Sequence, residues 1–188
     1  MGKLIENRIV REKDCLLEWV KKSKNGDIKA FELIYEYFKI QIFNLAYRYT
    51  NNHVIAEDLV HDIFIKAFTN IRKLEEEKSF KKWLFRIAVN TCLDYLRKHK
   101  RIQSENISSS EAQIGKGEYT ITNEILELAI SNLPFKMKTV FLLHDVQGFK
   151  HEEIARILKC SIGTSKSQLF KARKKIREYL IKRGGIGK

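Results

Sequence analysis

Apolar residues recur through most of the chain at intervals of three and four positions, the spacing that gathers side chains on one face of an α-helix. The first such stripe lies within residues 27–50 and follows Gly26-Asp27, a break that ends in a typical N-cap residue. The stripe consists of Phe31, Ile34, Phe38, Ile42, Leu45 and Tyr49. We therefore expect one long helix with a single buried face, ended by Asn51-Asn52.

Two further helices are expected in the first half of the chain. One runs from about residue 54 to 71, and its buried face comprises Ala56, Leu59, Val60, Ile63, Phe64, Ala67 and Phe68. A charged loop over residues 72–79 follows. The next helix buries Phe80, Trp83, Leu84, Ile87, Ala88, Thr91, Cys92, Tyr95 and Leu96, and it ends in the basic run 97–101. This pattern predicts a helical bundle over residues 20–101, preceded by an N-terminal extension, residues 1–19.

Residues 102–123 interrupt the periodic pattern with serine, glycine and isolated charges, and we expect a flexible linker there. A second helical unit is expected over residues 124–183. It contains a helix up to Leu133, a helix from Pro134 to about Val146, and a final helix pair. The tail, residues 184–188, is expected to fray. The predicted fold is all-α, with two small helical domains joined by a flexible linker.

The final helix pair predicts a helix-turn-helix at about residues 151–171. This motif needs two helices that cross through a short turn, with small or aliphatic side chains where they touch. The first helix offers Ile154, Ala155 and Leu158, and Cys160 fills the turn. The second helix offers Ile162, Leu169, Ala172, Ile176 and Leu180 at helical spacing.

The charge of the chain indicates a polyanionic partner. The formal net charge is +13 and the isoelectric point is about 9.6. Residues 151–188 hold eleven lysine and arginine residues against three glutamates, so the surplus is concentrated on the helix-turn-helix rather than spread for solubility. Nucleic acid is favoured over a membrane surface, because the basic helices carry serine and glutamine and no wide apolar face.

No metal site, cofactor or enzyme is indicated. Cys15, Cys92 and Cys160 lie far apart, and we expect them to be small buried apolar groups in a reducing compartment. The carboxylates lie on helix faces or in the charged loop, which disfavours an enzyme that acts on DNA. Residues 1–14 mix charges with apolar residues, and no uncharged stretch is long enough to span a bilayer. A cytoplasmic protein without stable membrane insertion is expected.

Two segments of the first half resemble region 2 of bacterial RNA polymerase sigma factors of the extracytoplasmic function (ECF) group. They are "AEDLVHDIFIKAF" (residues 56–68) and "FKKWLFRIAVNTCLDYLRKHKR" (residues 80–101), and the upstream "GDIKAFELIYEYF" resembles the start of that region. Residues 132–173 resemble region 4 of the same group. The resemblance covers about residues 20–180 in the right order. It implies a non-catalytic factor that binds core RNA polymerase and directs promoter-specific initiation of transcription.

The resemblance also implies partners and the surfaces that meet them. One helix would dock on the clamp coiled coil of the largest polymerase subunit. It carries Asp58, Leu59, Val60, His61, Asp62, Ile63 and Phe64. Its acidic side chains suit a basic partner. The helix around residues 140–146 would dock on the flap of the second-largest subunit. An anti-sigma factor is a further partner of such proteins.

Two sets of residues would meet DNA. Region 2 would recognise and open the minus-ten element with Lys81, Lys82, Arg86, Asn90, Asp94, Arg97 and Lys98. Phe80 and Trp83 could stack on an unpaired base, but for Trp83 a place in the core is favoured, because it continues the apolar stripe through Ile87. Region 4 would recognise the minus-thirty-five element with Lys166, Ser167, Gln168, Phe170, Lys171, Arg173 and Lys174. Lysine and arginine suit phosphates, and serine and glutamine suit base edges.

The chain departs from the common pattern of the group at five positions. They are His61 for glutamine, Lys138 for arginine, Lys159 for glycine, Ser165 for valine and Gln168 for arginine. The last of these bears on the promoter sequence, because glutamine prefers adenine where arginine prefers guanine.

A second interpretation is a freestanding helix-turn-helix regulator that does not engage polymerase. Residues 20–101 would then bind a ligand or form a dimer. The resemblance of residues 56–68 to a polymerase-docking helix argues against this alternative.

Overall fold

The structure is a computed structural model that describes residues 15–103 and 121–183. Within these residues the chain forms helices and no strand. The first domain contains a helical segment, residues 15–24, then α2 (Ile28–Thr50), α3 (His53–Asn70), the 3-10 turns η1 (Ile71–Lys73) and η2 (Glu77–Ser79), and α4 (Phe80–Gln103). The second contains α5 (Ile121–Ser131), α6 (Phe135–Phe141), the π-helical turn η3 (Leu142–Val146), α7 (His151–Leu158) and α8 (Ile162–Lys182).

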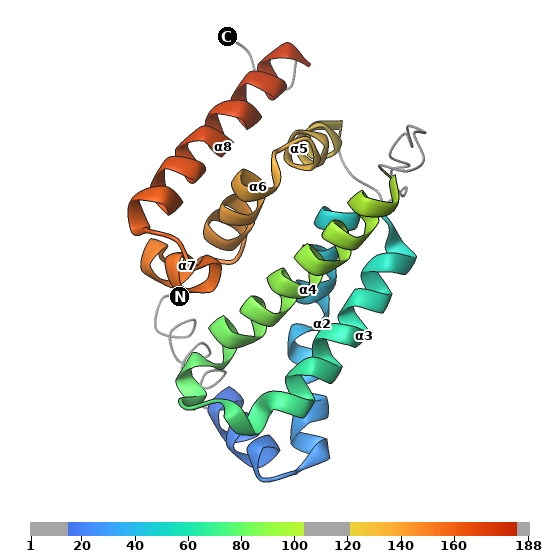
Figure 1. The fold of residues 1–188 in the computed structure, drawn as a ribbon, viewed down its shortest axis with the longest axis vertical. Helices are drawn as coiled ribbons and strands as arrows, with labels where there is room; N and C mark the ends of the chain where they lie inside the picture. Colours follow the sequence, from blue (N-terminus) through green and yellow to red (C-terminus); the bar gives the residue numbers. More distant parts are fainter. Residues whose placement is uncertain (1–14, 104–120, 184–188) are drawn as a thin grey trace, which may run out of the picture.

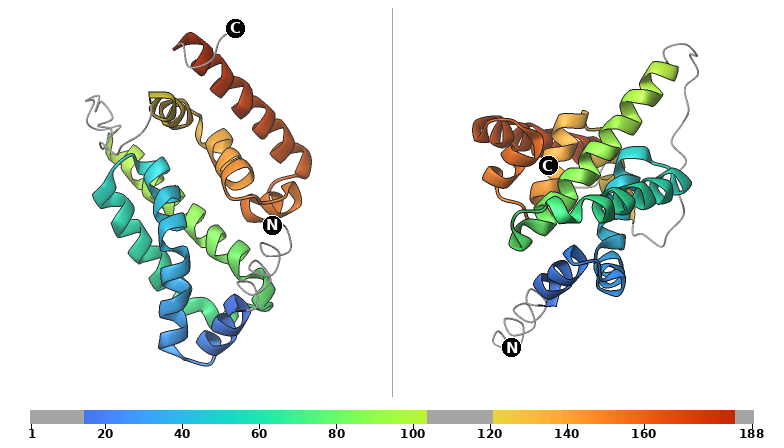
Figure 2. Two further views of the ribbon diagram at one scale, coloured as in Figure 1. Left: turned by 180° about the vertical axis from the view of Figure 1, so that it is seen from behind. Right: turned by 60° about the horizontal axis from the view of Figure 1, so that its bottom comes forward.

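The two domains lie side by side. In Figure 1, α4 of the first domain faces the second domain, and α8 runs along the outer edge of the molecule. The view from behind in Figure 2 agrees, with α8 far from α3. Residues 104–120, which include most of the predicted linker, and the predicted tail 184–188 lie outside the described residues.

Polar caps fix the starts of three helices. The side chain of Asp27 accepts a hydrogen bond from the backbone N–H of Ala30 at 3.1 Å, as its place after Gly26 predicts. Asn52 caps α3 and Ser161 caps α8 in the same way. Asn51 ends α2 in the left-handed conformation, with φ of 51°.

The predicted apolar stripes form the core of the first domain. Ile34, Phe38 and Ile42 of α2 are at most 1% exposed. Phe68 is an exception: it lies at the edge of the core with 44% of its surface exposed and packs on Phe31. Residues 15–19, assigned from the sequence to an extension, begin a helix whose Trp19 packs on this core.

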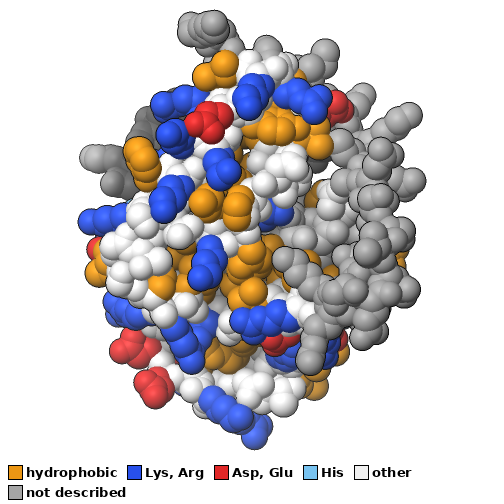
Figure 3. All heavy atoms as spheres, turned by 45° about the horizontal axis from the view of Figure 1, so that its top comes forward, with side chains coloured by type: hydrophobic (Ala, Val, Ile, Leu, Met, Phe, Trp, Pro, Cys, Tyr) orange, Lys and Arg blue, Asp and Glu red, His pale blue; other side chains and the backbone are white. Residues whose placement is uncertain are grey.

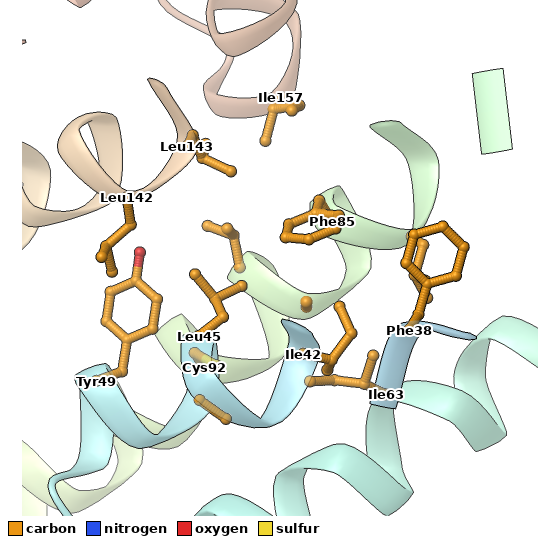
Figure 4. Packing of buried hydrophobic residues seen from close by; sticks show 14 of the residues in the cluster. Phe38, Ile42, Leu45, Tyr49, Ile63, Phe85, Cys92, Leu142, Leu143 and Ile157 are labelled. Atoms are coloured by element: carbon orange, nitrogen blue, oxygen red, sulfur yellow. The ribbon is translucent and has the colours of Figure 1, made fainter. Parts of the chain in front are cut away.

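The two domains share one continuous apolar core. Figure 4 shows Leu142, Leu143 and Ile157 of the second domain facing Tyr49, Leu45 and Phe85 of the first. All of these side chains are at most 6% exposed. The Phe85 ring also meets the Phe149 ring edge-on, with 5.2 Å between centroids. Burial of this surface favours the packed arrangement, since each large apolar side chain removed from water contributes about 1.5–3 kcal/mol.

Polar contacts join the domains where α2 ends. We call this group the latch; it comprises Arg48, Tyr49, Glu127, Lys138 and Thr139. Arg48 donates two hydrogen bonds to the Glu127 carboxylate, at 3.1 and 2.7 Å. The Tyr49 hydroxyl donates to Thr139 Oγ1 at 2.7 Å, and Lys138 Nζ donates to the backbone oxygen of Arg48 at 3.1 Å.

Lys138 gives the stability of the protein a pH dependence. Only 8% of the residue is exposed, and burial lowers the pKa of its ammonium group to about 8. Between about pH 8 and 10 the folded protein loses this proton while the unfolded chain keeps it, so the free energy of unfolding should rise with pH, by up to about 2 kcal/mol. Above that range the buried Tyr49, whose pKa burial raises, acts in the opposite direction. Urea unfolding at a series of pH values measures the effect.

The control for this prediction is Lys138→Met, which keeps the length of the side chain and removes its charge. The rise in the free energy of unfolding between about pH 8 and 10 should be clearly smaller in this variant, in which Lys81, whose pKa burial also lowers, still contributes. An equal rise in both proteins would show that other groups cause it.

Candidate nucleic-acid and polymerase interfaces

The helices α7 and α8 form the predicted helix-turn-helix. Ile154 and Ala155 of α7 are buried, as are Leu169 and Ala172 of α8, so the small and aliphatic faces meet. Lys159 turns the chain between the helices with φ of 51°, and its N–H donates to the backbone oxygen of Ala155. Glycine adopts this left-handed conformation at least cost, which accounts for glycine in the common pattern at this position.

A polar pair lies where the two helices cross. Ser165 is fully buried, and its hydroxyl lies 2.9 Å from Nδ1 of His151 at the start of α7. Burial, followed by the nearby His144 and Lys166, lowers the pKa of His151, so the ring is neutral at neutral pH and can pair with a hydroxyl. This hydrogen bond explains how serine is accommodated where the common pattern has valine.

The outward face of α8 carries most of the residues predicted to read the minus-thirty-five element. Lys166, Ser167, Phe170, Lys171 and Lys174 are exposed, and Gln168 is half-buried at the edge. The Phe170 ring is 71% exposed, which is unusual for so large an apolar side chain. On the face that Figure 3 presents, lysine and arginine side chains outnumber acidic ones. Such a surface suits the phosphates and base edges of a major groove.

Arg173 of the same predicted set is engaged within the protein. Its guanidinium donates to both carboxylate oxygens of Asp145 in η3, at 2.9 and 2.6 Å. The hydrogen bond to Arg173 lowers the pKa of Asp145, and the pKa of Arg173 rises in turn. In this structure Arg173 therefore holds α8 against η3, and no pattern in the sequence indicates Asp145 as its partner.

Five residues predicted to meet the minus-ten element lie on the exposed face of α4. They are Arg86, Asn90, Asp94, Arg97 and Lys98. Arg97 approaches Asp94 one turn earlier at 3.5 Å. These five residues lie three or four positions apart or next to each other, so they share one face of α4. The face is mainly basic and can bind DNA phosphates.

The other two residues of the minus-ten set point at the second domain. Lys82 Nζ forms an ion pair with Glu153 of α7 at 2.9 Å. Lys81 Nζ donates to the backbone oxygen of Gln147 at 3.3 Å and lies over the Phe149 ring, 5.3 Å from its centroid. Burial lowers the pKa of Lys81, and Glu153 partly offsets the effect. We call these interactions, with the Phe85–Phe149 ring pair, the cleft contacts.

A cleft of about 540 Å³ opens beside the cleft contacts. The segment 73–79 and α4 line one side, and Glu153, Arg156 and Ile157 of α7 line the other. Trp83 borders the cleft and is half-buried, whereas Phe80 is 1% exposed. Phe80 belongs to the core, which corrects its prediction as a stacking residue, and Trp83 packs partly against that core while it borders the cleft.

The predicted docking helix α3 presents only part of its set to a partner. Asp58, His61 and Asp62 are exposed, together with Glu57. The four apolar members are at most 5% exposed and pack in the core: Leu59, Val60, Ile63 and Phe64. In this structure these four side chains form part of the core of the first domain, and their role as direct polymerase contacts stays a prediction. A groove of about 340 Å³ between α2 and α3 adjoins the exposed acids.

The segment predicted to meet the polymerase flap is also largely covered. Val140, Leu142 and Leu143 are at most 2% exposed, and Figure 4 shows Leu142 pointing toward Tyr49 of the first domain. Val146, 41% exposed, lies at the open end of this segment. A partner that uses residues 140–146 would therefore meet only part of them here.

Neither a metal site nor a membrane span occurs in the described part of the chain. Residues 15–103 and 121–183 hold no group of three or more histidine, cysteine or acidic side chains that could bind an ion. No helix among these residues is long and apolar enough to cross a membrane. The cysteines are free, but only Cys92 is buried; Cys15 is exposed and Cys160 intermediate, so the expectation that all three are buried is wrong.

Comparison with known proteins identifies the two domains. The family "Sigma-70 region 2" matches residues 34–102, and "Sigma-70, region 4" matches residues 123–176. The ECF RNA polymerase sigma-E factor of Haemophilus influenzae is 36% identical over 172 residues, which cover 84% of this chain and 90% of that protein. The chain belongs to the ECF group of the sigma-70 family. Its function is accordingly promoter-specific initiation of transcription with RNA polymerase.

Other sigma factors support this assignment. The sigma-E factor of Escherichia coli is 32% identical over 84% of this chain and 90% of its own length. The solved structure of the sigma factor RpoE of Bartonella quintana, in complex with the anti-sigma factor NepR, superposes with a TM-score of 0.72 at 28% identity. That alignment covers 81% of this sigma factor and 97% of the other chain. The predicted DNA and polymerase residues all lie within the two matched regions.

Proposed function

We propose that this sigma factor binds core RNA polymerase through α3 and reads two promoter elements with two helices. The exposed face of α8 would read the minus-thirty-five element, and the exposed face of α4 with the neighbouring cleft would read and open the minus-ten element. The observation that carries the proposal is the basic outward face of α8 in a complete helix-turn-helix. Lys166 and Lys171 would bind phosphates, and Ser167 and Gln168 would meet base edges.

The polymerase contact would rest on charge complementarity. Glu57, Asp58 and Asp62 form an acidic patch on an otherwise basic protein, and such a patch favours a basic partner. His61 lies between the acids on the same exposed side. We infer the clamp of the largest subunit as the partner of this patch and the flap of the second-largest subunit as the partner of the segment around Val146.

The same proposal assigns the protein no catalytic step of its own and places its action in the bacterial cytoplasm, where polymerase and DNA are. An anti-sigma factor is proposed as a further partner. The supporting observation is that the Bartonella quintana sigma factor, similar to this chain over most of its length, was solved in complex with one.

Co-elution with core RNA polymerase tests the proposal. The wild-type protein should co-elute with the core enzyme on a sizing column. The double variant Asp58→Arg/Asp62→Arg should bind at least about tenfold more weakly, because it sets like charges against the basic partner. Runoff transcription by the resulting complex would then report promoter-specific initiation.

A variant with the same change of charge elsewhere serves as the control. Glu124 and Glu178 are exposed on α5 and α8, and Glu124→Arg/Glu178→Arg should co-elute like the wild type. Loss of binding in both variants would point to net charge rather than to α3. A wild-type protein that binds DNA but not the core enzyme would refute the polymerase contact.

A further inference from the structure

Two polar links hold the first half of α8 against the elements that precede it. Arg173 donates two hydrogen bonds to the Asp145 carboxylate of η3, at 2.9 and 2.6 Å. Ser165, eight positions earlier on α8, is fully buried, and its hydroxyl lies 2.9 Å from Nδ1 of His151 at the start of α7. Eight residues of α-helix span about 12 Å, so two links at this separation fix the tilt of α8 as well as its place.

His144 joins the two links into one network. Its Nδ1 lies 2.7 Å from the Asp145 carboxylate, and its ring stacks on the His151 ring with 4.6 Å between centroids. His144 and Asp145 both lie in η3, a π-helical turn, and such turns are rare and frequently occur at functional sites. We call this network the α8 support; it comprises His144, Asp145, His151, Ser165 and Arg173.

The residues proposed to read DNA lie between the two links. Lys166, Ser167, Gln168, Phe170 and Lys171 all fall between positions 165 and 173 of α8. Base edges are read by hydrogen bonds of defined length and direction, so the reading depends on how α8 is oriented in the groove. The α8 support is therefore placed to determine this orientation from the inner side of the helix.

Arg173 is the member of the predicted minus-thirty-five set that this arrangement turns away from DNA. Its Nε and one terminal nitrogen both donate to Asp145, and a bidentate pair of this kind fixes the direction of the guanidinium. The carboxylate also offsets the positive charge that would attract a phosphate. The geometry thus favours an effect of Arg173 through α8 over a direct contact with DNA.

The charges around His151 make the α8 support sensitive to acid. A proton on this ring would set a positive charge against the stacked His144 ring. Lys166 and Arg173 of α8 add to the repulsion, and Glu152 of α7 opposes it. Burial first, and then these cations, lower the pKa of His151 from its usual 6.5. A state in which α7 and α8 have separated binds this proton more readily, so the supported arrangement loses stability as the pH falls below about 6.5.

We propose that Asp145 and His151 are positioning residues for promoter recognition, which hold α8 through Arg173 and Ser165 in the orientation that reads DNA, and that protonation of His151 weakens this hold. Arg173 acts through Asp145 and does not contact DNA. The proposal rests on the proposed function for the role of α8 in reading the minus-thirty-five element. The apparent affinity for a duplex then scales with the fraction of molecules in which α8 is held in this way.

Removal of the Asp145 carboxylate tests the positioning role in the full-length chain. The probe is a fluorescein-labelled duplex that the wild-type chain selects from a random-sequence pool, and fluorescence anisotropy measures the affinity. Asp145→Asn and Arg173→Gln should each bind about three- to tenfold more weakly. Asp145→Asn raises the net charge and Arg173→Gln lowers it, so a loss in both variants cannot come from general attraction to DNA. The double variant should bind no more weakly than either single one, because the two residues act as a unit.

Glu124→Gln is the matched control for the loss of one carboxylate. Glu124 is exposed on α5, and its replacement should leave the affinity unchanged or raise it slightly. If Asp145→Asn instead binds the duplex more tightly than the wild type, release of Arg173 has created a DNA contact, and the positioning role is refuted. Circular dichroism confirms that each variant remains helical; if Asp145→Asn does not, the pH series with a His151 variant carries the test.

This pH series separates positioning from a merely structural role. The affinity of the wild type should fall about three- to tenfold between about pH 7.5 and 5.5, although added protons strengthen general attraction to DNA. His151→Asn keeps a polar side chain near Ser165 but cannot gain a charge, so its affinity should change much less. His53→Asn is the matched control and should keep the wild-type pH dependence, because His53 is exposed and begins α3 as His151 begins α7.

Two results of the pH series would overturn the proposal. One is a wild-type affinity that stays constant or rises in acid, and the other is a His151→Asn variant that loses affinity in acid as the wild type does. A chain that selects no duplex would refute reading by α8 and the positioning role with it. Co-elution with core polymerase decides the polymerase contact separately. If that contact fails while the variants behave as expected, the positioning role stands; if the contact holds while the variants bind like the wild type, only the positioning role fails.

Discussion

Replacing Phe85 with alanine should lower the free energy of unfolding by about 3–5 kcal/mol. Phe85 is fully buried on α4, where it packs on Phe149 of the second domain and under the ammonium of Lys81. Alanine would leave a cavity at the centre of the shared core, and the helices around it can collapse only in part. Urea unfolding followed by circular dichroism measures the change.

Phe170→Ala is the matched control, because it removes the same atoms from an exposed site. Phe170 is 71% exposed on α8, so its loss should change the free energy of unfolding by less than about 0.5 kcal/mol. Its effect is expected in promoter binding instead. If Phe85→Ala were as mild as Phe170→Ala, the two domains would not pack on each other through α4 in solution.

The double variant Lys166→Glu/Lys171→Glu should bind promoter DNA about a hundredfold more weakly or worse. Both lysines are exposed on the outward face of α8, where two phosphate contacts would be lost and two repulsions gained. The dependence of affinity on salt should weaken as well, since fewer counterions are released on binding. Fluorescence anisotropy with a promoter found by runoff transcription, repeated over a salt series, measures both effects.

Lys21→Glu/Lys182→Glu makes the same change in net charge away from this face. Lys21 is exposed in the first helix, and Lys182 lies about 24 Å along α8 from Lys166. This control should weaken promoter binding only slightly. Equal losses in the two double variants would mean that the overall charge, and not the outward face of α8, holds the DNA.

The sequence predicts the local structure well because helix periodicity and caps are local signals. Phe38 and Ile42 lie in the core as their spacing indicates, and Asp27 and Ser161 cap the helices that follow them. The helix-turn-helix was predictable for the same reason. Its two helices are adjacent in sequence, and each shows one apolar and one polar face.

The contacts between the domains could not be predicted in this way. Lys81 and Gln147 are 66 positions apart, and nothing in the spacing of either marks the other as its partner. Phe85 and Phe149 are absent from the buried faces predicted from the sequence, yet both are buried and their rings pack on each other. Lysines that look available to DNA in the sequence thus prove to be engaged in the structure.

The predicted docking helix α3 shows a different limit of prediction from sequence. Leu59, Val60, Ile63 and Phe64 belong both to an apolar stripe and to the resembled docking segment, and a side chain cannot serve the core and a partner at once. The structure assigns them to the core and leaves Asp58, His61 and Asp62 outside. The ion pair of Arg173 was not predicted from the sequence, because its acidic partner Asp145 lies 28 positions away.

The shared core has a consequence for the order in which the protein is made. Domains fold as they leave the ribosome, N-terminal first, so α2 to α4 emerge before any of the helices that cover them. Phe85 and Tyr49 then line an uncovered apolar surface until α6 and α7 have been synthesised. The nascent first half therefore exposes an apolar surface that favours aggregation and chaperone binding. The second half covers this surface once it has folded.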